Sequence, residues 1–244
     1  SKQYEVTVEG TIDARGTSPE NRDCRFGAFV DDGLHDVHVR MRGVPSKGEA
    51  PKLARFHNVD LGGTDMHVGG GTMDMIGCRH TGPIEFVCVY WPSTNISNNE
   101  LVRSPIKAVT VNHLVMEGNR FSECEAYALY LHANSPKFKV ILRNNVFSDN
   151  GIALYLIHPG GPESVLSGNT FCRNRVGVYC YSKVTMEITG DALFDNEFGM
   201  QLKDGVVRLD KCVFGMDAKR KAPNSGYDVQ TSGAVTMTSC VLAS

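Results

Sequence analysis

A short phrase of sequence recurs along the chain, and this repeat constrains the fold more than any other feature. The residue that anchors each copy is apolar, with one histidine as the exception. A repeat of this length is typical of a solenoid, in which each unit buries its apolar side only against its neighbours. The anchors recur every 19 to 28 residues, at Leu61, His80, Leu101, Phe121, Phe147, Phe171, Phe194, Phe214 and Leu242.

Apolar and polar residues alternate on both sides of the anchors, which predicts strands with one inward face. The long stripes of period 3.6 that an α-solenoid needs are absent. Before Phe194 the pattern requires one added residue, which places Met186 and Ile188 inside. Seven and five residues before the other anchors stand apolar pairs such as Met73/Met75, Leu114/Met116, Val140/Leu142, Val207/Leu209 and Val235/Met237. After the anchors, the inward residues include Leu129/Leu131, Leu154/Leu156, Val178/Cys180 and Met200/Leu202.

Glycine, asparagine, aspartate and serine separate these strands, as expected of tight turns. Two or three short strands in each unit of about 20 to 25 residues fit a parallel β-helix. Side chains that stack on successive units can form a ladder of hydrogen-bonded amides. We predict such a ladder two residues before the anchor, from Asn99, Asn119, Asn145 and Asn169.

The phrases Ser167-Gly168-Asn169-Thr170-Phe171 and Gly151-Ile152-Ala153-Leu154 resemble the repeat of right-handed parallel β-helix proteins of the pectate-lyase-like superfamily. The resemblance covers about Ala54 to Leu242. It is closest in style to intracellular β-helix adaptor domains, such as those of F-box proteins and the Shc SH2-domain-binding protein group. It implies an all-β, right-handed solenoid of about eight to nine turns with an irregular N-terminal β cap. Proteins of unrelated function share these phrases, so the resemblance assigns no catalytic residue.

Residues 1–50 depart from the repeat. Alternation at Tyr4, Val6 and Val8, and again from Val37 to Met41, still indicates strands. We expect this segment to cap the solenoid and residues 51–244 to form it, as one continuous domain. Since the chain begins with Ser1 rather than methionine, we expect a fragment or a processed form.

Composition indicates a soluble protein and argues against two classes of partner. With a formal net charge of −2, the chain has no overall positive field that would favour nucleic acid. Its one basic run, Lys219-Arg220-Lys221, is interpreted as a solvated loop. No apolar run approaches the roughly 20 residues that span a bilayer, so we expect no membrane partner.

The eight cysteines show neither CxxC pairs nor the spacing of a zinc site. They follow the repeat as small buried side chains, which predicts free thiols and a cytoplasmic protein. Two features of the sequence leave other interpretations of the cysteines and of the location open. Cys212 and Cys240 would stack on adjacent turns, close enough for a disulfide, and Asn95-Ile96-Ser97 is a glycosylation sequon that weakly favours secretion.

The candidate binding site lies on the outer face of the strands that follow the anchors. Tyr130, Tyr155 and Tyr179 are expected to form one vertical column, beside the small residues Ala128, Ala153, Gly177 and Gly199. Aromatic side chains with polar tips suit contact with a protein or a sugar, although aromatic neighbours also stabilise sheets. The complete predicted set is Tyr130, Tyr155, Tyr179, His132, Tyr181, Gln201 and Lys203.

No catalytic constellation can be assembled on this face. Its single acid, Glu85, is expected to lie far from the tyrosines, whereas glycoside hydrolysis needs paired carboxylates. Gly69-Gly70-Gly71 lacks the lysine of a phosphate loop, and alternation separates His35 from Asp36 and His38, which argues against a metal site. We expect no catalytic residue, metal or cofactor.

The leading hypothesis is a non-catalytic recognition or scaffold module that presents a rigid sheet to a protein partner. The alternative is a carbohydrate-binding or carbohydrate-cleaving β-helix, similar to a polysaccharide lyase or hydrolase, or to a viral spike.

Overall fold

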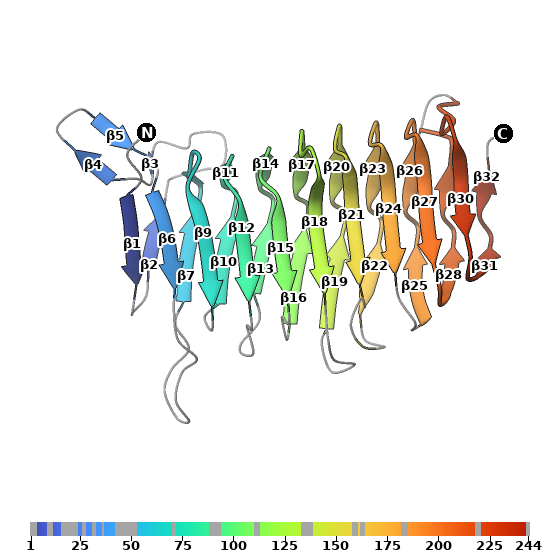
Figure 1. Ribbon diagram of the computed structural model, residues 1–244, viewed down its shortest axis with the longest axis horizontal. Coiled ribbons are helices and arrows are strands. Elements are labelled where there is room, and N and C mark those ends of the chain that lie inside the picture. The colour runs from blue at the N-terminus through green and yellow to red at the C-terminus, as the bar shows by residue number, and fades with distance from the viewer. Residues whose placement is uncertain are drawn as a thin grey trace.

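A computed structural model of the chain shows an elongated stack of β-strands (Figure 1). From residue 53 to 242 the structure describes all but residues 70–71, 88–93, 110–112, 133–138, 158–160, 162–163, 182–184 and 218–220. Before residue 53 it describes the backbone of six strands.

Three parallel sheets, named A, B and C, run the length of the stack, and each has ten strands within the described residues. Sheet A contains β1 (Tyr4–Val8), β6 (Val37–Met41), β9 (Asp65–Gly69), β12 (Ile84–Val87), β15 (Ile106–Val109), β18 (Tyr127–His132), β21 (Ile152–Ile157), β24 (Val176–Tyr181), β27 (Phe198–Lys203) and β30 (Tyr227–Thr231). Sheet B contains β2 (Ile12–Arg15), β7 (Leu53–His57), β10 (Thr72–Ile76), β13 (Thr94–Ser97), β16 (His113–Glu117), β19 (Lys139–Arg143), β22 (Val165–Ser167), β25 (Thr185–Thr189), β28 (Val206–Asp210) and β31 (Ala234–Thr238). Sheet C contains β3 (Cys24–Arg25), β8 (Val59–Asp60), β11 (Arg79–His80), β14 (Glu100–Val102), β17 (Arg120–Ser122), β20 (Val146–Ser148), β23 (Thr170–Cys172), β26 (Ala192–Phe194), β29 (Val213–Phe214) and β32 (Val241–Leu242).

One strand from each sheet makes one coil, so the all-β solenoid predicted from the repeat is confirmed. Ten strands per sheet exceed the eight to nine turns that we expected, because N-terminal strands also join the sheets. β1, β2 and β3 pair in parallel with the strands of the next coil. Within the described residues, only β4 (Ala28–Val30) and β5 (Gly33–His35) form a separate antiparallel hairpin. The boundary near residue 50 stays a prediction.

The predicted anchors form a column inside the stack, with one correction. Phe121, Phe147 and Phe171 are fully buried, and their rings stack at centroid distances of 4.6 and 5.0 Å. In the next coil Phe171 pairs with Leu193, not with Phe194, which is only half-buried. Leu193 as the anchor also places Met186 and Ile188 inside without an added residue.

The residue three positions before each anchor has a positive φ, which supports this register. Glycine adopts that backbone conformation most readily, followed by asparagine, and other residues adopt it less often. Gly190 therefore marks Leu193 as the anchor of its coil. The series is Asn58, Gly77, Asn98, Gly118, Asn144, Gly168, Gly190, Lys211 and Ser239.

The predicted amide ladder is present and extends further than expected. Each asparagine donates from Nδ2 to Oδ1 of the next, and Asn169 donates to the carboxylate of Asp191. A second ladder, which was not predicted from the sequence, runs along the corner between sheets C and A. The first ladder is Asn99, Asn119, Asn145, Asn169 and Asp191, and the second is Asn150, Asn174, Asn196 and Asn224.

Cysteines occupy the column of the first ladder beyond its ends. The thiols of Cys78, Cys212 and Cys240 donate to backbone carbonyls of the preceding coil, as the amides of the ladder do. Cys212 and Cys240 lie on adjacent coils as predicted, and both are free thiols. Cys88 lies outside the described residues.

Candidate functional site

One column of side chains runs along the middle of the outer face of sheet A, the sheet nearest the viewer in Figure 1. The strands pair in register, so equivalent residues of successive coils stand one above another, about 4.8 Å apart. We call this set the central column. It comprises His67, Glu85, Lys107, Tyr130, Tyr155, Tyr179, Gln201 and Gln230.

Three stacked tyrosines form the centre of this column, as predicted. The rings of Tyr130 and Tyr155 lie 5.3 Å apart, and those of Tyr155 and Tyr179 lie 4.7 Å apart, with interplanar angles of 25° and 29°. Both faces of the Tyr155 ring are therefore covered. The Lys203 ammonium lies 5.9 Å from the centroid of Tyr179. The Tyr155 ring can therefore be contacted at its edge and hydroxyl group but not at either face.

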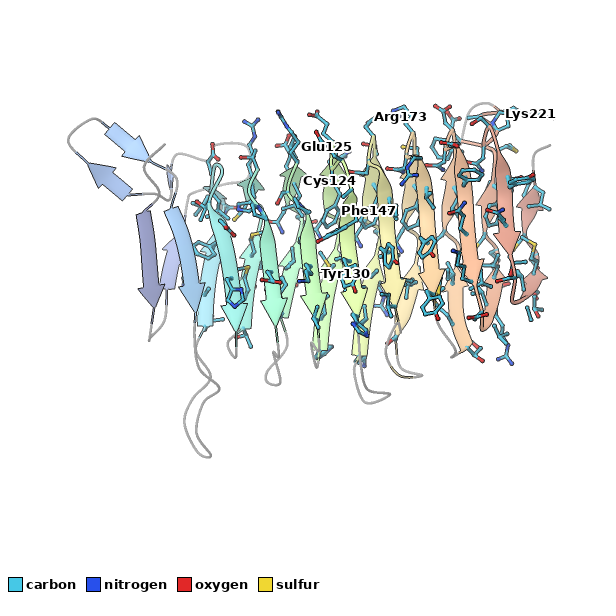
Figure 2. All side chains as sticks on the ribbon, in the orientation of Figure 1. Cys124, Glu125, Tyr130, Phe147, Arg173 and Lys221 are labelled. Atoms are coloured by element: carbon cyan, nitrogen blue, oxygen red, sulfur yellow. The ribbon has the colours of Figure 1, made fainter. Side chains whose placement is uncertain are left out.

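Alternation along each strand positions these rings. Tyr130 stands between the inward side chains Leu129 and Leu131, which are buried in the core. The same pattern places Tyr155 in β21 and Tyr179 in β24 on the outer face. Figure 2 labels Tyr130 on the outer face of sheet A. Burial, followed by the neighbouring phenols, raises the pKa of Tyr155, so its hydroxyl group is neutral at physiological pH.

The remaining predicted residues flank this stack. His132, Tyr181 and Lys203 belong to the neighbouring column, and the His132 ring meets Tyr130 edge-on at 6.5 Å. Tyr181 is 42% exposed. Gln201 follows Tyr179 in the central column. The structure thus brings all seven residues onto one face, and their role in binding stays a prediction.

Four small residues that we expected beside the tyrosines point inward instead. Ala128 and Ala153 are fully buried, and Gly177 and Gly199 are buried too. They stand at the corner where the chain enters sheet A and packs tightly against neighbouring coils. A Cβ atom on Gly177 would lie 2.6 Å from the carbonyl oxygen of Gly199. The expectation that they lie on the outer face was wrong.

Glu85 is closer to the tyrosines than expected, because only Lys107 separates it from Tyr130 in the central column. Its carboxylate lies 2.7 Å from the Lys107 ammonium and 3.0 Å from the His67 ring nitrogen. The hydrogen bond from Lys107 is the main cause that lowers the pKa of Glu85. Glu85 is therefore an ionised, paired carboxylate, and the central column offers no second carboxylate for acid–base hydrolysis.

A shallow hollow of about 390 Å³ lies at one end of the tyrosine stack. Lys203 supplies the only charged side chain among its lining residues. The Gln201 amide donates a 2.9 Å hydrogen bond to Gln230 on its edge. We call it the Lys203 hollow, and its lining is Tyr179, Gln201, Leu202, Lys203, Gln230, Thr231 and Ser232.

A second hollow of about 370 Å³ lies near the other end of the stack, at the corner between sheets C and A. The corner has three residues in one coil, 103–105, and four in the next, 123–126, so it lengthens by one residue between these coils. Figure 2 labels Cys124 and Glu125 at this step. Burial raises the pKa of the Cys124 thiol to about 11, which makes it a poor nucleophile at neutral pH. The lining is Arg103, Pro105, Glu123, Cys124, Glu125, Ala126 and Tyr127.

No group of three or more histidine, cysteine, aspartate or glutamate side chains within the described residues is arranged to hold a metal ion. The side chains of His35, Asp36 and His38 lie outside them. In the part of the chain that the structure describes, no helix is long and apolar enough to cross a membrane.

Besides His67 and Glu85, three contributors to this face were not included in the predicted site. Lys107 and Gln230 extend the central column, and Tyr127 contacts Tyr130 at a ring distance of 5.6 Å. Lys107 could have been found from its place in the alternation. Gln230 follows a corner much longer than the others, which hid its register.

Coiled parallel strands with internal amide ladders define the class of parallel β-helix proteins. A family described as "Right handed beta helix region" matches residues 55–193, more than half of the chain. The chain belongs to this right-handed β-helix family. No curated protein and no solved structure matches the chain significantly.

Proposed function

We propose that this protein is a non-catalytic recognition module and that the outer face of sheet A binds a protein partner. The observation that carries the proposal is the stack of Tyr130, Tyr155 and Tyr179, held in register on a rigid sheet. Tyrosine combines a large apolar ring with a polar tip and loses little conformational entropy on binding, so it is frequent at interfaces. A stack already formed in the free protein reduces that loss further.

The orientation of the rings favours a protein over a sugar. A sugar that stacks on an aromatic residue needs an exposed ring face, and Tyr155 has both faces covered. Ring edges and hydroxyl groups suit the mixed apolar and hydrogen-bonding surface of a protein.

The Lys203 hollow supports a second candidate, binding of an acidic carbohydrate. Its lining combines one ring, two amides, two hydroxyl groups and an ammonium group. Cleavage is less well supported, because the one carboxylate of the central column is held by Lys107 and His67. The free, mostly buried cysteines among the described residues support a cytoplasmic location.

Replacing Tyr130, Tyr155 and Tyr179 together by alanine tests the main proposal. We expect the triple variant to lose the partners that the wild-type protein captures from its native cells, as quantified by mass spectrometry. A triple phenylalanine variant keeps the rings and removes the hydroxyl groups. A partial loss of capture by this variant would measure how much the hydroxyl groups contribute to binding. Circular dichroism must show that both variants remain folded.

A variant on another face provides the matched control. Glu187→Ala with Arg208→Ala removes an exposed ion pair from sheet B, and it should leave capture unchanged. Capture by the alanine variant at the wild-type level would contradict the proposal. A parallel glycan array would favour the carbohydrate candidate if the wild-type protein bound sugars and no protein.

A further inference from the structure

The charge of the Lys203 hollow differs in sign from that of the whole chain. The chain carries a formal net charge of −2, yet Lys203 is the only charged residue that lines this hollow. Asp204 follows Lys203 in the chain but is not part of the lining. Among the described residues, no carboxylate lies within ion-pair distance of the Lys203 ammonium. The other lysine on this face, Lys107, is already paired with Glu85.

A ligand in the hollow could reach the Lys203 ammonium. The group lies 5.9 Å from the centroid of Tyr179, a distance at which the ring attracts a cation. The Lys203 side chain is also exposed at the mouth of the hollow. Its cationic head is thus placed beside the tyrosine stack and open to solvent.

Neutral hydrogen-bond donors line the same hollow. Gln230 uses its amide oxygen to accept from Gln201, so its own amide N–H groups remain available to donate. The Ser232 hydroxyl oxygen accepts from the backbone N–H of Asp204 and keeps its own proton to donate. A carboxylate accepts from one ammonium and several neutral donors at once, and hydrogen bonds to an ionised group are the stronger kind.

We infer that the Lys203 hollow binds the carboxylate of an acidic side chain within a segment of the protein partner. The inference rests on the proposed function and names the chemistry of that partner. Next to the hollow, Tyr181 and the half-buried Ile157 offer apolar surface in one column. The segment should therefore pair an aspartate or glutamate with a neighbouring apolar residue.

Selection from a random peptide library displayed on phage tests this inference without a known partner. The library is selected in parallel on the wild-type protein, on Lys203→Glu and on Lys211→Glu. Lys211 is an exposed lysine in the turn between β28 and β29, next to Asp210, so its reversal changes the net charge equally, away from the hollow. Lys211 has a positive φ. Glutamate is tolerated at such a position, since Glu123 also has a positive φ.

We expect peptides selected on the wild type and on Lys211→Glu to be enriched in acidic residues, and those selected on Lys203→Glu not to be. For the best synthetic peptide, Lys203→Glu should weaken binding at least about tenfold, because attraction becomes repulsion. Lys203→Arg should stay within about threefold, and rising salt should weaken wild-type binding.

Several outcomes would overturn the inference. Selected peptides without acidic enrichment but dependent on the tyrosines would refute it and leave the recognition function standing. The inference also fails if Lys203→Glu binds acidic peptides as tightly as the wild type does. If no peptide is selected and oligogalacturonate binds in a Lys203-dependent way, both the carboxylate inference and the proposed protein partner fail.

Discussion

At the scale of single residues, Asp191 is the member of the amide ladder with different chemistry. An asparagine in this column, such as Asn169, donates from Nδ2 to a carbonyl of the preceding coil. An ionised carboxylate has no proton to donate, whereas a protonated one does. Burial, only partly offset by hydrogen bonds from Asn169, raises the pKa of Asp191 to about 7.

This shift predicts that stability falls as pH rises. An unfolded aspartate titrates near a pKa of about 3.9. Between pH about 4 and about 7 the folded protein therefore keeps a proton that the unfolded chain has released. Up to about 4 kcal/mol of stability is lost across that window, since each pKa unit corresponds to about 1.4 kcal/mol. Asp191→Asn should remove this dependence and stabilise the protein at pH 7, as measured by urea unfolding at several pH values.

Asp149 provides a control of opposite sign. The hydrogen bonds from Arg173 lower the pKa of Asp149, and this pair is exposed. Asp149→Asn should therefore leave the loss of stability above pH 4 in place. An equal slope in the wild type and Asp191→Asn would contradict the role assigned to Asp191.

Single residues also show where prediction from sequence reached its limit. Leu193 and Phe194 are both apolar, so the repeat alone did not distinguish them, although Gly190 marks the correct one by its backbone. Ala128 was assigned to the outer face because strict alternation was extended beyond the point where the chain turns the corner. Alternation holds inside a strand and fails at its ends, where the chain changes direction.

At the scale of elements, the first amide ladder ties the coils together where sheets B and C meet. Asn145 accepts from the backbone and side chain of Asn119, and it donates to Met116 and Asn169. All these groups are buried. Asn145→Ala leaves several of them without a partner, and each one costs about 1 to 3 kcal/mol.

We therefore expect Asn145→Ala to lower the free energy of unfolding by more than about 3 kcal/mol, because several hydrogen bonds of one buried network are lost together. Arg143→Ala is the control, since Arg143 is exposed two residues away. Chemical denaturation of both variants checks the prediction. A loss below about 1 kcal/mol for Asn145→Ala would show that water or a shifted neighbour replaces the amide.

The elements that the sequence predicted well are the strands, because their inward residues repeat from coil to coil. The corner from sheet C to sheet A was predicted poorly, since its length varies between coils. Asn150, Asn174 and Asn196 each stand three residues after an anchor, so most of the second ladder could have been found. Asn224 stands behind a longer corner and breaks that spacing. The central column could likewise be traced from the sequence only as far as Gln201, because Gln230 follows this longer corner.

At the scale of the whole molecule, each coil is stabilised by the coils on either side of it. The last described coil, β30 to β32, has a neighbour on one side only (Figure 1). Most of the large apolar side chains that are exposed in the described residues belong to it, including Tyr227, Val241 and Leu242. The same type of residue should thus contribute differently to stability according to its coil.

Leu209 and Met237 test this expectation, because they pair in adjacent strands of sheet B and occupy the same inward column. Leu209 is 1% exposed and Met237 is 38% exposed. Leu209→Ala should cost about 2 to 5 kcal/mol, the usual effect of a cavity in a packed core. Met237→Ala should cost less than about 1 kcal/mol, because part of its side chain already contacts water. Urea unfolding of both variants measures the two costs. Equal losses of unfolding free energy would mean that another surface covers the last coil in solution.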